Sequence, residues 1–380
     1  MSRISATARN STRGASATRA SGGEPTGASA RASGGVPARA SGGAVETTGP
    51  ASAAAGPSSA GAAALPAPSS RAGAWAELLR LPALFTVPGD ALAGAAAAGA
   101  RPGPRTLLAI GSSLCLYEAG MALNDWADRA EDAVERPHRP LPSGRIRPGA
   151  ALAAAGALTG AGLALAAGAG RPALTIAVPL AATVWAYDLT LKHTPAGPAA
   201  MAAARGLDLL LGAAATGAGA RAALPSAALL GSHTLAVTAV SRRETTGGSA
   251  LAPLAALATT GALTGLVARR RTRLPAGRRA AAAPGLSGSI PAPGVADALR
   301  TGLSAVYAAT AARPYFHAVL NPSPPLTQRA VGGGIRATIP LQAALAARSG
   351  AGATSLLVAA LAPAGRWFAK RTAMRKVSIT

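Results

Sequence analysis

The sequence predicts an all-α, polytopic membrane protein with about nine transmembrane helices. Apolar residues make up 49% of the 380 residues and charged residues only 13%, about half the charged share of an ordinary globular protein. The apolar residues come in runs long enough to cross roughly 30 Å of hydrocarbon as helices. Aromatic residues are scarce, at 3%, whereas Ala and Gly are abundant, which is typical of helices that pack closely through small side chains.

The first 73 residues differ from the rest in composition. Arg-Ala-Ser-Gly-Gly occurs at 19–23, 31–35 and 39–43, with Ser, Thr, Pro and Ala between the copies. No apolar face recurs, so we expect a disordered tail, and no apolar core follows the basic start as it would in a signal peptide. We therefore predict a disordered tail at 1–73, a membrane domain at 74–366 and a basic tail at 367–380.

Nine apolar segments follow the tail, and the last is interrupted by Arg348-Ser349-Gly350. Each is long enough to span a bilayer as a helix. The predicted spans are about 75–99, 105–126, 148–169, 172–191, 197–219, 222–242, 249–268, 295–313 and 337–363.

The net charge of +23 does not indicate a nucleic-acid-binding protein, because no soluble binding module accompanies it. Arginines between membrane segments mark loop orientation and contacts with lipid headgroups. The Arg-rich loop at 129–147 predicts that this face of the membrane is cytoplasmic. By the same count, the basic residues at 269–279 and at the C-terminus fall on the opposite face. Either the count is wrong by one near the end, or the early loops alone set the orientation.

Acidic residues gather in one stretch of a chain that has only 14 of them. Six lie between residues 118 and 135: Glu118, Asp125, Asp128, Glu131, Asp132 and Glu135. In a continuous helix, Asn124, Asp125, Asp128 and Asp132 would fall within an arc of roughly 100°. Such oxygen ligands suit Mg²⁺, and the arginines that follow can bind phosphate in a bidentate way. The pattern favours a metal–diphosphate site, and the alternative is a solvated loop of mixed charge.

Polar clusters end the second, fourth and sixth predicted spans. The second span ends in the acidic stretch, the fourth in Tyr187, Asp188 and Lys192, and the sixth in Ser241, Arg242 and Glu244. Even numbers of crossings separate these clusters, so all three open on one face of the membrane. They can meet at the mouth of one cavity, although Asp188 can equally be a simple helix-end residue.

Ionisable residues inside the spans also point to a cavity, because each costs on the order of 2.5–3.5 kcal/mol at a helix centre. Asp90 follows Pro88-Gly89, which predicts a kinked first span with Asp90 lining the cavity. Arg205 and Asp208 are three residues apart, so they either neutralise each other as a structural pair or lie on the cavity wall.

The spacing Asn124-Asp125-x-x-Asp128-x-x-x-Asp132, followed by Arg136-Pro137-x-Arg139-Pro140-x-x-Ser143-Gly144, resembles the first Asp-rich motif of the UbiA superfamily of intramembrane prenyltransferases. The layout of nine spans extends the resemblance over residues 75–365. Three further segments resemble the bacterial EboC-type subgroup: Tyr187-Asp188-x-x-Leu191-Lys192, Arg205-x-x-Asp208-Leu209-Leu210-Leu211-Gly212, and Ser241-Arg242-x-Glu244. Where better-known members have a second Asp-rich motif, this chain has only Glu244.

The resemblance implies a helical bundle around a central cavity and a Mg²⁺-dependent transfer of an isoprenyl group from an isoprenyl diphosphate to an unidentified acceptor. The implied metal ligands are Asn124, Asp125, Asp128, Asp132 and Glu244. The implied diphosphate-binding residues are Lys192, Arg136, Arg139 and Arg242. The resemblance also implies catalytic roles for Asp125, Asp128, Lys192 and Tyr187, whose ring can stabilise an allylic cation.

A transporter or an isoprenoid- or lipid-binding membrane protein with the same fold is the alternative, because intramembrane charges also mark transport pathways. The clustered carboxylates with an adjacent Arg loop favour the enzyme. The reduced second motif favours the alternative or an unusual substrate. In both cases the expected partners are the bilayer and an isoprenoid, and no nucleic acid.

Overall fold

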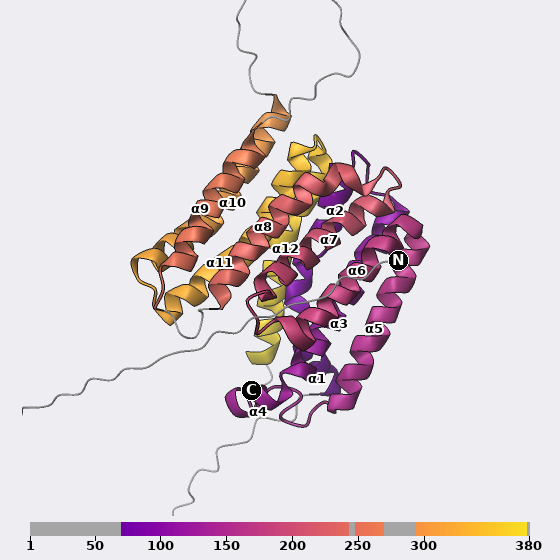
Figure 1. Ribbon diagram of the computed structural model, residues 1–380, viewed down its shortest axis with the longest axis vertical. Helices are drawn as coiled ribbons and strands as arrows, with labels where there is room; N and C mark the ends of the chain where they lie inside the picture. Colours follow the sequence, from indigo (N-terminus) through magenta and orange to yellow (C-terminus); the bar gives the residue numbers. More distant parts are fainter. Residues whose placement is uncertain (1–69, 243–247, 270–293, 378–380) are drawn as a thin grey trace, which may run out of the picture. The chain divides into compact units, whose positions relative to one another are not determined.

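Helices joined by short turns form the structure, as the sequence predicts (Figure 1). The computed structural model describes residues 70–242, 248–269 and 294–377, all within one unit, Leu65–Thr380. Every regular element in these ranges is helical. Most of the predicted tail, residues 1–69, lies outside the described residues, and the first helix begins at Arg71, before the expected boundary at residue 73.

The predicted first span is divided into three elements. They are α1 (Arg71–Leu78), the 3₁₀ turn η1 (Leu81–Thr86) and α2 (Pro88–Ala97). The Ser70 hydroxyl accepts a hydrogen bond from the Gly73 amide at 3.2 Å and so caps α1. Arg80, which joins α1 to η1, has φ +47° and is the one non-glycine residue with positive φ in the described ranges. That left-handed backbone is costly for a residue with a Cβ, and it turns the chain sharply before α2.

The next elements form the middle of the chain. They are α3 (Pro104–Ala127), α4 (Arg129–Glu135), α5 (Pro148–Ala169), α6 (Arg171–Ala186) and η2 (Tyr187–Leu191), a single π-helical turn. A proline stands in the first turn of α3, α5 and α6. Proline is tolerated there because the first amides of a helix have no intrahelical partner, so these prolines set where the helices begin.

The remaining elements complete the bundle. They are α7 (Gly197–Ala215), η3 (Ala220–Ala223), α8 (Leu224–Ser241), α9 (Leu251–Ala268), α10 (Val295–Leu320), α11 (Pro324–Arg348) and α12 (Gly352–Val377). The segment predicted as one span at 337–363 is therefore parts of two helices. Gly350, with φ +82°, lets the chain reverse between them.

This extra reversal bears on the predicted position of the C-terminal residues. The end of α12 returns to the end of the bundle that carries α1 and α4 (Figure 1). There the ring of Phe368 lies 5.6 Å from the ring of Phe85 in η1. Two helices thus stand where the prediction placed one span, and the end of α12 lies at the end of the bundle that carries α4 and the Arg-rich loop.

The chain is a multi-pass membrane protein. Among the described residues, five helices are long and apolar enough to cross a bilayer: Pro104–Ala127, Pro148–Ala169, Arg171–Leu191, Ala220–Ser241 and Leu251–Ala268. Large apolar side chains on these helices point outward, with Leu107 69% and Val178 51% exposed. Hydrocarbon chains rather than water suit that surface.

A close crossing of α2 and α7 supports the interior of the bundle. A Cβ on Gly94 would overlap the Leu209 carbonyl, and a Cβ on Gly212 would overlap the backbone of Ala91. The absence of side chains at these glycines lets the two backbones touch, as at other small-residue contacts between membrane helices. The crossing brings Asp90 of α2 beside Arg205 of α7.

Candidate active site

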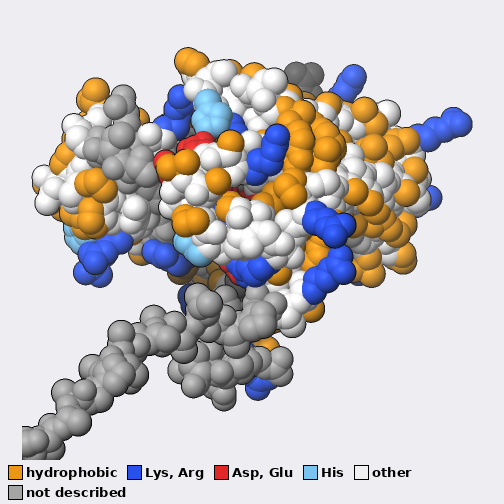
Figure 2. Space-filling model, turned by 90° about the horizontal axis from the view of Figure 1, so that it is seen from below, with side chains coloured by type: hydrophobic (Ala, Val, Ile, Leu, Met, Phe, Trp, Pro, Cys, Tyr) orange, Lys and Arg blue, Asp and Glu red, His pale blue; other side chains and the backbone are white. Residues whose placement is uncertain are grey.

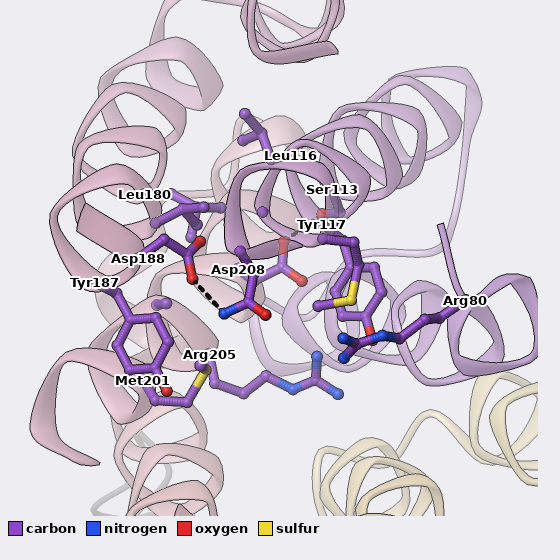
Figure 3. Close-up of a pocket in the computed structure, with 15 residues that line it drawn as sticks. Arg80, Ser113, Leu116, Tyr117, Leu180, Tyr187, Asp188, Met201, Arg205 and Asp208 are labelled. Atoms are coloured by element: carbon purple, nitrogen blue, oxygen red, sulfur yellow. Dashed lines mark hydrogen bonds between the residues drawn. The ribbon is translucent and has the colours of Figure 1, made fainter. Parts of the chain in front are cut away.

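A cavity of about 290 Å³ opens between α3, α6, η2 and α7, with Arg80 at its edge (Figure 3). Much of its wall is apolar, including Leu116, Leu180 and Val184. Its polar side chains lie in two places. One group surrounds Asn124, near the end of α3, and the other surrounds Ser113, eleven residues earlier and so about 16 Å away along the helix.

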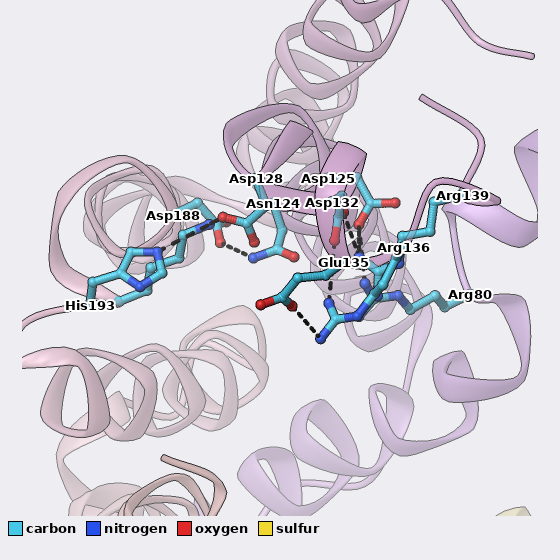
Figure 4. A network of polar contacts seen from close by, with 11 residues as sticks. Arg80, Asn124, Asp125, Asp128, Asp132, Glu135, Arg136, Arg139, Asp188 and His193 are labelled. Carbon is cyan, nitrogen blue, oxygen red and sulfur yellow. Dashed lines mark hydrogen bonds and ion pairs between the residues drawn. The ribbon is translucent and has the colours of Figure 1, made fainter. Parts of the chain in front are cut away.

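The acidic stretch does not form one continuous helix. α3 ends at Ala127, Asp128 stands at the junction, and Asp132 belongs to α4. The predicted convergence of four side chains depended on an unbroken helix across residues 124–132. The break instead separates them into two groups (Figure 4).

Arginines hold the first group. The Oδ1 atom of Asp125 accepts a hydrogen bond from the Arg80 guanidinium group at 3.1 Å. The same oxygen lies 3.5 Å from the guanidinium group of Arg139. Asp132 pairs with Arg139 at 2.8 Å and with Arg136 at 3.3 Å. Both carboxylates are buried, so the guanidinium groups neutralise charges that burial would otherwise penalise. The structure thus joins two predicted metal ligands to two predicted diphosphate ligands.

The second group, which we name the mouth group, consists of Asn124, Asp128, Asp188 and Lys192. Asn124 donates from Nδ2 to Oδ1 of Asp188 at 3.1 Å, and Lys192 forms an ion pair with Asp128. Asn124 comes from α3, Asp128 from the α3–α4 junction and Asp188 from η2 (Figure 4). Lys192 directly follows η2. Asn124 and Asp188 line the cavity, and Asp128 and Lys192 are electrostatic neighbours of Asp188. Carboxylate and amide oxygens of the cavity wall thus lie close to an ammonium group.

Asp128 also approaches a second set of possible ligands on its exposed side. Ligand atoms of Asp128, Glu131 and His193 lie within 4.8 Å of one another. The His193 Nε2 atom is 3.9 Å from Asp128, and its side chain is 69% exposed. Seen from this end, acidic side chains appear only in small patches among Lys, Arg and His side chains (Figure 2).

The π turn explains how residues near the end of α6 reach the cavity. The Lys192 amide bonds to the Tyr187 carbonyl at 2.9 Å, five residues back. Such a turn shifts the helical register locally and is frequent at functional sites. Tyr187 and Asp188 both line the cavity. From the sequence alone, Asp188 could also have been a simple helix-end residue. The signal that it lines a cavity was its position directly after a long apolar run.

Of the two alternatives for Arg205 and Asp208, the structure favours a place on the cavity wall over an ion pair with each other. Arg205 contacts Asp90 through Nε at 3.0 Å, whereas Asp208 accepts a hydrogen bond from Ser113. Arg205 and Asp208 line the cavity. Asp90 is fully buried behind that wall and is also held by Gln342, whose Nε2 donates to it at 2.6 Å.

One predicted diphosphate ligand has another position. Arg242 lies at the end of α8, where it donates to the carbonyl of Thr194 and joins α8 to the segment that follows Lys192. Glu244, the proposed ligand from the sixth span, lies outside the described residues. Arg80 was absent from the prediction, and its position between two apolar stretches was the signal for it.

Comparison with known sequences finds a protein family that part of this chain matches. Residues 84–246 match the UbiA prenyltransferase family. A digeranylgeranylglyceryl phosphate synthase of Methanothrix thermoacetophila is 38% identical over 107 residues, which are 28% of this chain and 40% of that protein. The corresponding enzyme of Methanopyrus kandleri is 37% identical over 98 residues, or 26% of this chain and 36% of that protein. The aligned part thus spans well under half of these relatives.

Solved structures share the fold at lower identity. A digeranylgeranylglyceryl phosphate synthase superposes with a TM-score of 0.50 at 18% identity, covering 73% of this chain and 98% of that one. A UbiA homologue from Archaeoglobus fulgidus bound to GPP and Mg²⁺ gives 0.50 at 17% identity, covering 76% and 99%. These similarities show that the helical arrangement is the one found in UbiA homologues.

Proposed function

Because residues 84–246 match the UbiA prenyltransferase family, we propose that this chain is a Mg²⁺-dependent intramembrane prenyltransferase. It would move an isoprenyl group from an isoprenyl diphosphate to an acceptor. The observation that carries the proposal is the mouth group, in which the cavity-lining residues Asn124 and Asp188 adjoin the ion pair of Asp128 with Lys192, beside a largely apolar cavity. An isoprenyl diphosphate has a matching division, because its head group is charged and its tail is a hydrocarbon chain.

The donor set of the mouth group fits Mg²⁺. Asn124, Asp128 and Asp188 offer hard oxygen ligands, and Mg²⁺ commonly takes one or two carboxylates together with substrate phosphates. Asp125 and Asp132 would act through the arginines that they hold. Glu244 remains a proposed further ligand. When bound, the metal would offset the charge of the diphosphate as its bond to the isoprenyl carbon weakens.

Basic side chains would bind the diphosphate oxygens. Lys192 is close to the proposed metal ligand Asp128, and Arg139 and Arg136 lie on the adjacent α4 side, partly exposed at 23% and 46%. Charges fixed in place before the reaction stabilise the leaving group at little reorganisation cost. The apolar wall would exclude water from the allylic cation, and the ring of Tyr187 would stabilise it.

A non-catalytic transporter or lipid-binding protein is the second candidate. The observation that favours it is the pairing of Asp125 and Asp132 with arginines, since such a network is also expected of a purely structural element. A binder of this kind would retain the isoprenyl diphosphate without cleaving it.

The test uses the purified full chain in lipid nanodiscs with radiolabelled geranylgeranyl diphosphate, Mg²⁺ and a lipid extract as the acceptor source. We expect pyrophosphate release and label in the lipids, with Asp128→Asn lowering both by about 10²–10³-fold. Glu135→Gln is the matched control, because Glu135 is an exposed acid of the same stretch, and it should stay within about threefold of wild type.

Two results would count against the proposal. Tight binding of the diphosphate without cleavage or transfer would establish the binding protein instead. Full activity of Asp128→Asn would show that the mouth group does not bind the metal through Asp128.

Several finer assignments belong to the same proposal. We propose a member similar to the EboC-type subgroup, located in a bacterial inner membrane with the mouth group on the cytoplasmic side. The Arg-rich loop at 129–147 and the basic end of α12 support that orientation. The digeranylgeranylglyceryl phosphate synthases among its relatives supply one acceptor class to try first.

A further inference from the structure

An ion pair outside the mouth group joins α1 to the loop between α4 and α5. Glu77, in the last turn of α1, accepts hydrogen bonds from Arg145 with both carboxylate oxygens, from Nη1 at 2.8 Å and from Nη2 at 3.2 Å. We propose that this pair, which we name the clamp, positions Arg80 and Arg139 and so sets how tightly the diphosphate binds. This inference rests on the proposed transferase function and assigns two positioning residues to it.

Glu77 fixes the backbone of the first arginine. Its carbonyl oxygen accepts a hydrogen bond from the amide of Arg80 at 3.2 Å, in the turn where Arg80 has φ +47°. Glu77 thus binds the loop with its side chain and the turn at Arg80 with its backbone. A shift of Glu77 would therefore shift the point from which the Arg80 side chain projects.

Arg145 fixes the backbone beside the second arginine. Its Nη2 group donates to the carbonyl of His138 at 2.6 Å, and its Nε group donates to the hydroxyl of Ser143 at 3.0 Å. His138 directly precedes Arg139. The planar guanidinium group has five donors in a rigid fork, so Arg145 can hold α1 and two points of the loop at the same time.

The two positioned arginines meet on one oxygen atom. Oδ1 of Asp125 lies 3.1 Å from Nη2 of Arg80 and 3.5 Å from Nη1 of Arg139 (Figure 4). The contacts thereby form a closed ring, which runs from α1 through the clamp and the loop to Asp125 and back through Arg80 to α1. Opening the ring at the clamp would leave Arg80 and Arg139 free to move relative to each other.

Apolar packing rather than the ion pair holds α1 against the loop. Leu78 of α1 and Leu141 and Ile146 of the loop are 0%, 6% and 4% exposed and belong to one buried cluster. The side chains of the clamp are 34% and 25% exposed, and ion pairs with such exposure add little to stability. We therefore expect loss of the clamp to change the orientation of the arginines more than the folding of the chain.

Arg139 is the member of the ring through which the clamp would act on the diphosphate. Its side chain is 23% exposed, and its hydrogen bond to Asp132 uses Nη1, one of the donors of its guanidinium group. Bidentate binding of phosphate oxygens requires that the guanidinium plane be held in one orientation. Residues that orient a binding side chain in this way typically contribute about tenfold or more to affinity.

The first measurement is the binding of geranyl S-thiolodiphosphate with Mg²⁺ to the full chain in nanodiscs. We expect Glu77→Gln to weaken binding by about tenfold. Arg145→Lys keeps the charge but loses the fork, and it should weaken binding by about threefold or more. Asp297→Asn is the matched control, because it removes the acid of another ion pair, with Arg300 on α10, and it should stay within about twofold of wild type.

A double-mutant cycle then tests whether Glu77 acts through Arg139. Arg139→Gln alone should weaken binding by about 10–100-fold, the value of a charged hydrogen bond. Adding Glu77→Gln to it should cost less than about twofold more, since the side chain that the clamp positions is already absent. If Glu77→Gln does not fold, Arg145→Lys takes its place in the cycle.

Two results would overturn the proposal. Additive losses in the cycle would show that the clamp supports the protein in general and not through Arg139. Wild-type affinity in Glu77→Gln would show that the ring keeps its geometry without the clamp. Failure of the thiolodiphosphate to bind wild type would instead count against the transferase function itself.

Discussion

The ammonium group of Lys192 forms an ion pair with the carboxylate of Asp128, although 64 residues separate them in the chain. Lys192 follows the π turn after α6, and Asp128 stands where α3 gives way to α4. The mouth of the cavity is therefore assembled by two local departures from regular helix. Substitutions at this contact should affect chemistry more than folding.

Lys192→Met should lower kcat/KM for the isoprenyl diphosphate by about 10²–10³-fold, because a fixed charge beside the leaving group is lost. The side chain is replaced by one of similar length, so packing changes little. His193→Gln is the neighbouring control and should stay within threefold, since that side chain is 69% exposed. Steady-state release of pyrophosphate measures both, and equal losses in the two variants would contradict a specific role for Lys192.

The Mg²⁺ dependence distinguishes the two possible ligand sets around Asp128. Asp188→Asn should raise the Mg²⁺ concentration for half-maximal activity by tenfold or more, because a charged oxygen ligand becomes a neutral one. Glu131→Gln should leave it within twofold. If Glu131→Gln raised the Mg²⁺ requirement and Asp188→Asn did not, the metal would lie on the exposed set of Asp128, Glu131 and His193.

Arg80 allows the backbone strain to be separated from the side-chain contact. Arg80→Ala and Arg80→Gly both delete the ion pair with Asp125, but only glycine adopts φ +47° without a Cβ penalty. The glycine variant should therefore be more stable than the alanine variant by about 1 kcal/mol. Unfolding in mixed micelles measures the difference, and a more stable alanine variant would show that the turn rearranges.

The α2–α7 crossing should not accept a methyl group. Gly212→Ala would place its Cβ against the backbone of Ala91, so the helices must separate, at a cost of about 1–3 kcal/mol or more. Gly156→Ala on α5 has open space around its Cβ and should be neutral or stabilising by up to about 1 kcal/mol. Similar stability of the two variants would mean that the crossing adapts at no cost.

The buried pair of Asp90 and Arg205 should show strong coupling. Arg205→Met alone leaves a fully buried carboxylate without its cation, which typically costs about 3–5 kcal/mol. The double variant Asp90→Asn with Arg205→Met removes both charges and should recover at least half of that loss. A double-mutant cycle on the free energy of unfolding measures the coupling, and strict additivity would refute it.

The fold class could be predicted from composition and apolar run length, because these follow directly from the demands of a bilayer. The end of the chain could not, since the polarity of residues 324–336 concealed part of α11 and the turn at Gly350 lies inside an apolar stretch. Within the site, clustering of the acids was visible in the sequence. Their division into two groups was not, because it depends on the break at Asp128 and on Arg80, whose partner is 45 residues away.

Gln342 has a consequence for how the chain can be cut. Its amide reaches Asp90 and the Thr86 carbonyl from α11, far beyond residue 246, where the family match ends. A fragment that stopped after α8 would contain every residue of the mouth group yet leave the carboxylate behind Arg205 exposed on one side. The later helices thus support residues of the earlier ones that lie behind the cavity, and a shortened version of this protein should keep them.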